Sequence, residues 1–336
     1  MKIAIVGAGN WGENLVRVVH QLGVLHRVCD SRPERLRQLA AKFPGVQFES
    51  SLETILDDSS IDGVMVATPA ETHSAVAKIL LDAGKDVFVE KPLALRCEEA
   101  EKLIALANGK SRILMVGHLL EFHPAIVRLQ ELVDNGELGR LEYIYSNRLN
   151  LGKIRREENA LWSFAPHDIS VILLLLKELP IQVAATGGSY LQPNIADVTV
   201  STMLFDRGVR AHLFVSWLHP YKEQKLVVVG ERGMAVFDDM RSSDKLQIFD
   251  KKINLIDGQF ITQRPTGQPV SIPPSEPLRL ECEHFLQCIE TRQTPKTDGA
   301  DAWRVLKVLQ ASQRSLSMNG EPVQLQPLRS LEVVHA

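Results

Sequence analysis

The chain has 336 residues, of which 45% are hydrophobic and 24% charged, and its 38 basic side chains nearly balance 41 acidic ones. This composition is typical of a globular protein with two domains of ordinary size and excludes a largely disordered chain. The net charge of −3 and the longest apolar run, residues 171–176, predict neither a nucleic-acid nor a membrane partner, since a bilayer span needs roughly 20 apolar residues.

The start of the chain and the cysteines bear on where the protein works. Met1 is followed at once by a strand-like segment, so we expect no secretory leader and a cytoplasmic protein. The four cysteines form no C-x-x-C pair and favour reduced, mostly buried thiols over a disulfide frame or a zinc site. They are Cys29, Cys97, Cys282 and Cys288.

Short apolar runs alternate with segments of helical spacing over the first 118 residues. Strands buried on both faces of a parallel sheet have this appearance, and each parallel pair needs a crossover helix. We therefore predict a doubly wound parallel sheet for residues 1–118. The runs are residues 3–6, 24–29, 63–67, 86–89 and 113–117.

A complete G-x-G-x-x-G motif follows the first run and opens a helical segment. In it Gly7, Gly9 and Gly12 permit a tight turn, close backbone approach to a pyrophosphate and close helix packing, and Asn10 and Trp11 lie between them. An ordinary glycine turn in an α/β protein is the other interpretation. The strand before the motif, the helix after it and an acidic residue downstream together favour a Rossmann domain that binds a dinucleotide.

The acidic residue is Asp30, which follows the second run near the spacing expected for a carboxylate that hydrogen-bonds a ribose 2′-hydroxyl. A carboxylate there would repel a 2′-phosphate, which favours NAD over NADP. Arg32, two positions on, partly offsets that repulsion. We count Asp30, Ser31 and Arg32 among the residues that contact the cofactor.

Two further motifs follow strand-like runs. Glu90 and Lys91 stand before Pro92, at the carboxyl end of a parallel strand where ligands lie in open sheets, and we count both among the residues that contact the cofactor. A lone lysine after a strand is usually a solvated loop residue, but the proline restricts the backbone of Lys91 more than an idle lysine requires. Thr68 and Pro69 occupy the same place in the preceding βα loop, where they either contact the cofactor or simply begin the next helix.

Beyond residue 140 the pattern changes to long alternating stretches separated by turn signals. They predict an α+β domain with a predominantly antiparallel sheet. Two helices over residues 281–290 and 302–316 close the chain, after an extended connector at residues 266–277. The alternating stretches are residues 141–150, 183–191, 198–205, 209–217, 225–229 and 234–237.

Pro166, His167 and Asp168 stand before the apolar run 171–176. We predict that they begin a buried helix, with Asp168 in the first turn, where the helix dipole favours a carboxylate. Read from this stretch alone, His167 is a satisfied buried histidine.

Taken together, the motifs resemble the Gfo/Idh/MocA family of NAD(P)-dependent sugar oxidoreductases. The resemblance covers nearly the whole chain and rests on the glycine motif, Ala67-Thr68-Pro69, Glu90-Lys91-Pro92, the histidine of Pro166-His167-Asp168, and the stretch from Glu283 to Ala302. It implies a Rossmann domain at 1–118, a substrate and oligomerisation domain with an open sheet at 119–275, and C-terminal helices that pack back on the first domain, with a tail, at 276–336.

The resemblance also implies roles for particular residues. Lys91 and His167 would flank the sugar carbon that gives up or accepts a hydride, His73 would join the cofactor site, and the Lys91–Pro92 bond would be cis. Many members carry an aspartate four residues before the histidine, where this chain has Ser163. Serine is no acid or base near neutral pH, so Lys91 and His167 must handle the proton and the alkoxide unless Asp168 has taken over the role of the missing aspartate. The sequence does not decide whether Lys91 or His167 is the base.

The substrate is predicted from the segment before His167. Arg148 and Asn150 share one face of a strand, and Arg155 and Arg156 follow it; arginines suit a diphosphate, although Arg155 and Arg156 taken singly read as solvated loop residues. The segment looks most like the nucleotide-sugar branch of the family, which oxidises the 3-hydroxyl of a UDP-N-acetylhexosamine. An inositol or simple aldose dehydrogenase is the alternative.

Two histidines after the run 113–117 suggest a metal, but the spacing of His118 and His123 is not that of a metal-binding helix, and hydride transfer to NAD needs no metal. We expect no metal, a substrate contact from His118, and a helix that begins at His123 and Pro124. A non-catalytic regulator that senses dinucleotides would keep the glycine loop but would not need Lys91 together with His167. We expect a homodimer or homotetramer.

Overall fold

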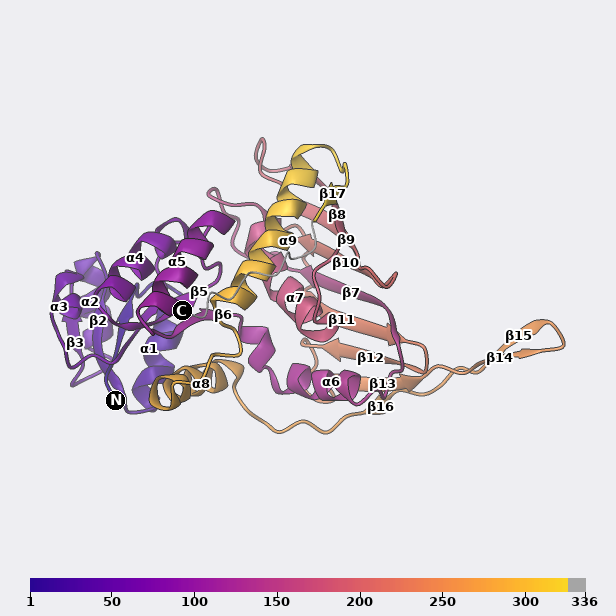
Figure 1. Ribbon diagram of the computed structural model, residues 1–336, viewed down its shortest axis with the longest axis horizontal. Coiled ribbons are helices and arrows are strands. Elements are labelled where there is room, and N and C mark those ends of the chain that lie inside the picture. The colour runs from indigo at the N-terminus through magenta and orange to yellow at the C-terminus, as the bar shows by residue number, and fades with distance from the viewer. Residues whose placement is uncertain (326–336) are drawn as a thin grey trace. The chain divides into compact units, whose positions relative to one another are not determined.

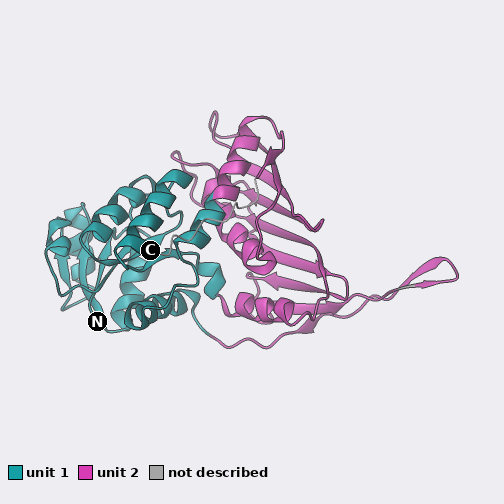
Figure 2. Cartoon of the chain, in the orientation of Figure 1, with its two compact units in different colours: residues 1–122, 275–306 teal, residues 123–274, 307–336 magenta. Residues whose placement is uncertain are grey.

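A computed structural model describes residues 1–325, which form two compact units (Figure 2). Unit 1 comprises residues 1–122 and 275–306, and unit 2 comprises residues 123–274 and the chain from residue 307 on. The tail expected at the end of the chain, residues 326–336, lies outside the described residues. Within residues 1–325, no helix combines the length and the apolar character that a membrane crossing requires.

Unit 1 contains a six-stranded parallel sheet in the order β3-β2-β1-β4-β5-β6, which is the doubly wound order of a dinucleotide-binding domain. The predicted Rossmann fold is confirmed. Only β3 escaped the sequence interpretation, because it is three residues long and half exposed. The elements are β1 (Ile3–Val6), α1 (Gly12–Gln21), β2 (Leu25–Cys29), α2 (Pro33–Ala40), β3 (Gln47–Glu49), α3 (Glu53–Leu56), β4 (Gly63–Val66), α4 (Ala70–Asp82), β5 (Asp86–Glu90), α5 (Cys97–Gly109), β6 (Leu114–Gly117) and the 3-10 helix η1 (Leu119–Phe122).

The core of unit 1 lies between the sheet and helices from both parts of the sequence. Strands β1, β4, β5 and β6 are buried throughout, which is why they read as continuous apolar runs. Helix α8 (Pro277–Thr291) packs on α1 and η1, and its Phe285 lies 5.8 Å from the ring of Phe88 on β5. A helix from late in the chain therefore completes the core of the cofactor-binding unit.

Unit 2 contains a nine-stranded sheet in the order β16-β13-β12-β11-β7-β10-β9-β8-β17. Every pair is antiparallel except β7 with β10, so the predicted mainly antiparallel sheet is confirmed. The elements are α6 (Pro124–Asp134), β7 (Leu141–Leu149), α7 (Ala160–Leu176), β8 (Gln182–Gly188), β9 (Val198–Leu204), β10 (Arg210–Ser216), β11 (Glu223–Gly230), β12 (Gly233–Asp238), β13 (Leu246–Asp250), the separate hairpin β14 (Ile253–Ile256) and β15 (Gln259–Thr262), β16 (Gln268–Pro269) and β17 (Val323–Gln324).

Helices α6 and α7 pack on this sheet, α7 against β7, β9 and β10 and α6 against β12 (Figure 1). As predicted, α6 begins directly after His123, whose Nδ1 accepts a hydrogen bond of 3.1 Å from the backbone N–H of Ala125. Helix α9 (Gly299–Ser317) begins in unit 1 and ends in unit 2.

The start of α7 differs from the prediction. The helix begins at Ala160, where the side chain of Asn159 accepts a hydrogen bond of 3.1 Å from the backbone N–H of Trp162. Pro166 therefore lies inside the helix, and the prediction that residues 166–168 begin it, with Asp168 in the first turn, is wrong. Asn159 is a preferred N-cap residue, and the apolar stretch that follows it continues the helix through the proline.

We predict that Asn159→Ala lowers the free energy of unfolding by about 1–2 kcal/mol, because the first turn of α7 loses its cap. The same side chain also donates a hydrogen bond of 2.8 Å to Gln313 Oε1. Asn159→Asp keeps the cap acceptor and loses only that donor, so it should cost less. Urea denaturation of the variants measures both changes, and equal losses in the two would contradict a cap at Asn159.

Candidate functional site

The glycine loop shows why each of its glycines is needed. Gly7 has a φ of +91°, and a Cβ there would lie 2.6 Å from the backbone of Ala67 and Thr68 after β4. A Cβ on Gly12 would lie 2.1 Å from the carbonyl oxygen of Gly7. These two glycines serve close packing, whereas a Cβ on Gly9 would meet only the Arg32 guanidinium, at 3.9 Å. The backbone at Gly9 is thus open to a ligand.

Asp30 is held in place directly after β2. One carboxyl oxygen accepts a hydrogen bond of 2.7 Å from the backbone N–H of Ala8, and Arg32 donates to both oxygens at 2.8 Å. Burial alone would raise the pKa of Asp30, but the bonds from Arg32 and from the Ala8 and Arg32 N–H groups lower that pKa below its usual value. The carboxylate is therefore charged and oriented at the edge where the strands end.

These residues fit a dinucleotide. The turn, the exposed Gly9 backbone and the N-terminus of α1 provide a cradle for a pyrophosphate, and Asp30 offers an acceptor to a ribose hydroxyl one strand away. Asn10 and Trp11 are exposed on the loop, and Ser31 is exposed beside Asp30. The parallel sheet brings all of these residues to one edge.

The loop after β4 is braced against the loop after β5. The ring nitrogens of buried His73 lie 2.8 Å from the carbonyl oxygens of Thr68 and Pro92, and burial lowers the pKa of this histidine. The hydroxyl of Thr72 lies 2.7 Å from that of Thr68, and Pro69 precedes α4. His73 thus serves as a brace between two loops. A contact of Thr68 or Pro69 with cofactor stays a prediction.

The end of β5 carries the charged pair. Glu90 is only 8% exposed and accepts a hydrogen bond from the indole Nε1 of Trp11. Burial raises the pKa of Glu90 to about 7, against the lowering effects of the Trp11 bond and the Lys91 charge. Lys91 is half-buried, and the Lys91–Pro92 bond is cis, as the resemblance implied.

His118 directly follows β6 and is 2% exposed. Neither ring nitrogen has a hydrogen-bond partner among residues 1–325. Burial lowers its pKa to about 4; Asp301 opposes that shift and Lys91 adds to it, so both charges lie near the ring. The imidazole is neutral near pH 7. Its unsatisfied nitrogens suit hydrogen bonds to a polar ligand, which keeps it a candidate for substrate binding.

In unit 2, the strand and helix that carry predicted substrate residues are joined by a buried ion pair. Arg148 on β7 donates to both oxygens of Asp168 on α7, at 2.6 and 3.1 Å, and Ser146 donates to the same carboxylate at 2.7 Å. Burial opposes the charge on Arg148, but Asp168 keeps the arginine pKa above its usual value. The sequence interpretation missed this pair; an arginine on the inward face of a strand was the signal that a buried carboxylate had to face it.

His167 is half-buried on α7, and buried Ser163 lies one turn before it on the same helical face. Asn150 follows β7, where its N–H donates 3.0 Å to the Ser216 carbonyl. Arg155 and Arg156 are exposed in the segment between β7 and α7, and Arg155 pairs with Glu158 at 3.1 Å. The chain thus brings Arg148 against Asp168 and His167 next to Ser163, while Arg155 and Arg156 lie at the surface of their unit.

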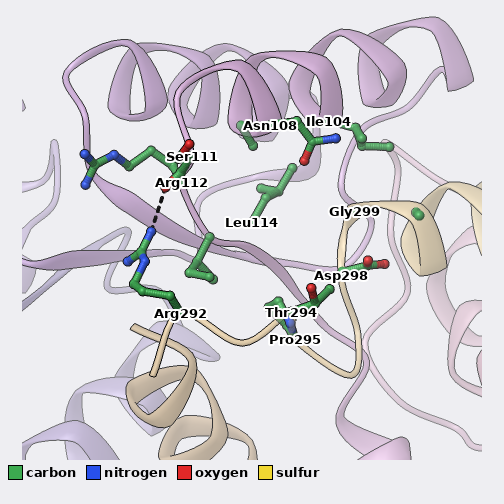
Figure 3. A pocket seen from close by; sticks show the side chains of 13 residues that line it. Ile104, Asn108, Ser111, Arg112, Leu114, Arg292, Thr294, Pro295, Asp298 and Gly299 are labelled. Atoms are coloured by element: carbon green, nitrogen blue, oxygen red, sulfur yellow. Dashed lines mark hydrogen bonds between the residues drawn. The ribbon is translucent and has the colours of Figure 1, made fainter. Parts of the chain in front are cut away.

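A separate pocket of about 490 Å³ lies in unit 1 between α5 and the segment before α9 (Figure 3). Ile104 and Asn108 line it from α5, and Thr294 and Pro295 lie opposite. It sits at the amino end of β6, the end of the sheet opposite to the glycine loop, so it is not the cofactor site. Across the described ranges, no three His, Cys, Asp or Glu side chains gather as metal ligands would.

The strand order, the glycine loop and the ordered Asp30 define a dinucleotide-binding α/β protein. A family model described as an oxidoreductase family with an NAD-binding Rossmann fold matches residues 1–118, and a model of the GFO/IDH/MocA C-terminal domain matches residues 126–236. The chain belongs to the GFO/IDH/MocA family of NAD-binding oxidoreductases, as its motifs suggested.

Relatives in the family have different substrates. The chain is 27% identical over 307 residues to UDP-N-acetylglucosamine 3-dehydrogenase of Acidithiobacillus ferrooxidans, covering 91% of this chain and 94% of that protein. It is 26% identical over 347 residues to the NAD(+)-dependent scyllo-inositol 2-dehydrogenase of Bacillus subtilis, covering 98% of both. A solved structure of the A. ferrooxidans enzyme, GnnA, superposes with a TM-score of 0.84 at 25% identity and covers 95% of this chain and 98% of that one.

We predict that Asp168→Ala lowers the free energy of unfolding by roughly 3–5 kcal/mol, because it leaves the buried Arg148 guanidinium without its anion. The double variant Arg148→Met/Asp168→Leu should recover much of that loss, since neither charge is then buried. A matched control is Asp134→Ala, which breaks the exposed pair with Lys177 and should cost about 1 kcal/mol or less. A loss for Asp168→Ala as small as that control would contradict the buried pair.

Proposed function

We propose that this oxidoreductase oxidises a secondary hydroxyl of a UDP-linked sugar to a ketone, with NAD as hydride acceptor, and that its substrate is UDP-N-acetylglucosamine or a related UDP-N-acetylhexosamine oxidised at the 3-hydroxyl. The observation that carries the enzyme assignment is Lys91 at the end of β5, on the sheet edge that also holds the glycine loop and Asp30. The sugar assignment is supported by the similarity to UDP-N-acetylglucosamine 3-dehydrogenase over 91% of this chain.

Two residues of the chain divide the acid–base work in this proposal. NAD, when bound, supplies the redox chemistry by accepting the hydride. Loss of a hydride turns the alcohol carbon into a carbonyl, so the hydroxyl proton must leave and the developing alkoxide must be stabilised. The positively charged ammonium of Lys91 would stabilise the developing alkoxide, and the imidazole of His167, which titrates near neutral pH, would accept the hydroxyl proton. Ser163, one turn before His167, offers a hydroxyl to the substrate but no acid or base.

Other residues have supporting roles in the proposal. Asp30, charged and oriented, would bind the adenosine ribose and disfavour a 2′-phosphate, which favours NAD over NADP. His118, with two unsatisfied ring nitrogens, would bind a sugar hydroxyl. Arg155 and Arg156 are exposed cations that would meet the diphosphate of the substrate. Arg148 would act indirectly, because its guanidinium already forms an ion pair with the carboxylate of Asp168.

A second candidate is an inositol dehydrogenase, which the similarity to scyllo-inositol 2-dehydrogenase over 98% of both chains favours. The same Lys91 and His167 chemistry would apply to a ring hydroxyl without a diphosphate. A third candidate, a regulator that binds dinucleotide without turnover, would not need both Lys91 and His167 in the chain.

We further propose a cytoplasmic homodimer or homotetramer. Helix α7 meets the face of β7 that carries Ser146 and Arg148, and the alternate residues of β7 lie on the other face. Tyr143 there is 43% exposed, and Val200 on β9 is 39% exposed. Exposed aromatic and aliphatic side chains on this face of the sheet support contact with a second copy.

The substrate test is to incubate the protein with NAD and separate pools of UDP-sugars, free sugars and inositols, while the formation of reduced nicotinamide is followed. We expect turnover with UDP-N-acetylglucosamine. Turnover with inositols alone would replace the proposed substrate by the second candidate. Tight NAD binding without turnover in any pool would favour the regulator.

We predict that Lys91→Ala and His167→Ala each lower kcat by roughly 100- to 10,000-fold, since each removes a group that acts on the reacting hydroxyl. The affinity for NAD, measured by calorimetry without substrate, should change little. Lys78→Ala, which removes an exposed lysine on α4 paired with Asp82, is the matched control and should retain full activity. A His167→Ala enzyme that keeps most of its kcat would remove that residue from the mechanism.

A further inference from the structure

The bond between Trp11 and Glu90 joins two loops that are far apart in the sequence. Trp11 closes the glycine loop after β1, and Glu90 is the last residue of β5. In the sheet, β4 lies between β1 and β5, so the bond passes over the end of β4. The strand order reverses between β1 and β4, and an open α/β sheet binds its ligand at this switch point, next to the end of β4.

The partners of this bond differ in exposure. The side chain of Glu90 is buried, whereas Trp11 is 41% exposed on the loop. On the other side of Glu90, a Cβ on Gly117 at the end of β6 would lie 3.0 Å from the second carboxyl oxygen, so a larger residue there would press on the Glu90 side chain. The carboxyl group is thus confined between an indole that faces the cofactor edge and a strand that cannot move closer.

The charged and titratable groups near Glu90 come from three directions. Lys91 follows it on the chain and lowers its pKa, as does the Trp11 bond, while burial raises it to about 7. Behind it on α8 lies Glu281, fully buried and with neither carboxyl oxygen bonded to any of residues 1–325. Burial first, and then the charges of Glu90 and Glu121, raise the pKa of Glu281 well above its usual value.

Burial and the neighbouring Asp301 likewise raise the pKa of Glu121 well above its usual value. His118 after β6 is neutral near pH 7, because burial lowers its pKa to about 4. Glu90, with a pKa of about 7, gains or loses its charge near neutral pH. It does so directly beside Lys91.

We propose that Glu90 is a positioning residue whose carboxylate, held by Trp11, couples dinucleotide binding in the glycine loop to the placement of Lys91. The inference rests on the proposed role of Lys91 in the reaction. A hydrogen bond to a charged acceptor is stronger than one to a neutral acceptor, so protonation of Glu90 loosens the link to Trp11 and removes the anion beside Lys91. The active form is the one with Glu90 ionised.

The proposal predicts that the pH profile of kcat/KM has an acidic limb, that is, a fall in activity on the acidic side of neutral pH. As the pH falls through about 7, Glu90 takes up a proton, and kcat/KM for NAD should fall with it. Glu90→Gln keeps an oxygen that accepts the Trp11 bond but cannot titrate, so it should lower activity by about tenfold at pH 8 and remove the acidic limb. Trp11→Phe removes a bond that lowers the pKa of Glu90, so it should move the limb to higher pH.

The chain offers a matched control in the same unit. Trp303 on α9 donates a hydrogen bond of 2.9 Å from Nε1 to Glu101 on α5, which repeats the indole–carboxylate pair away from the glycine loop. Trp303→Phe and Glu101→Gln should leave the pH profile unchanged. The double variant Trp11→Phe/Glu90→Gln should be no worse than the poorer single variant, because both changes break one link.

Calorimetric titration of NAD without substrate separates this inference from the proposed function. We expect the NAD dissociation constant of the wild type to weaken as the pH falls from 8 to 6, and that of Glu90→Gln to stay constant. This result would support the coupling whatever sugar the enzyme uses, and even if Lys91→Ala proved active. An acidic limb retained in Glu90→Gln, or left in place by Trp11→Phe, would overturn it.

Stability provides a readout that needs neither cofactor nor substrate. The pKa of Glu90 in the folded protein, about 7, lies above the usual carboxyl value of 4.5, so the folded state binds more protons between these pH values. The free energy of unfolding should therefore fall as the pH rises from 5 to 8, and fall less steeply in Glu90→Gln. Identical slopes in the two proteins would show that Glu90 does not titrate near neutral pH and would overturn the inference.

Discussion

Parallel strands that all end at one edge of a sheet are the constraint on which unit 1 depends. Because each crossover returns the chain to the same starting edge, the loops after β1, β2, β4, β5 and β6 collect at the opposite edge. Residues spread over more than a hundred positions, from Gly7 to His118, thereby become neighbours in one unit. The packing there is close: Gly7 touches the backbone after β4, and His73 is bonded to the loops after both β4 and β5.

The two units differ in whether their buried polar groups have hydrogen-bond partners. In unit 2, Arg148, Asp168 and Ser146 satisfy one another, which is the pattern of a structural pair that fixes a helix on a sheet. In unit 1, His118 and Glu281 are equally buried, yet their polar atoms have no partner within residues 1–325. Unsatisfied buried groups cost stability, and such a cost is typical of sites that bind ligands or move protons. We therefore infer that the functional residues of unit 1 include the buried groups around Glu90 as well as the glycine loop.

Membership in the GFO/IDH/MocA family fixes the class of chemistry and leaves the substrate to side chains outside the shared fold. A nucleotide-sugar dehydrogenase and an inositol dehydrogenase resemble this chain to nearly the same degree, 27% and 26%. Outside the glycine loop, this chain carries Ser163 one turn before His167, the exposed Arg155 and Arg156, and the neutral His118.

The sequence by itself determined the class of both sheets, the glycine loop, the acidic residue after β2 and the family, because these follow from apolar periodicity and from local turn chemistry. It missed the short strands β3, β13, β16 and β17. It failed at the start of α7, where the cap of Asn159 and the apolar residues after it outweighed a proline that reads as a helix start. Only the tertiary structure decided the partners of the buried charges. Asp168 meets Arg148 across twenty positions and Trp11 meets Glu90 across seventy-nine, and no local pattern encodes which donor reaches a carboxylate from another element. Those pairings depend on strand order and on burial, and they turn separate motifs into a site.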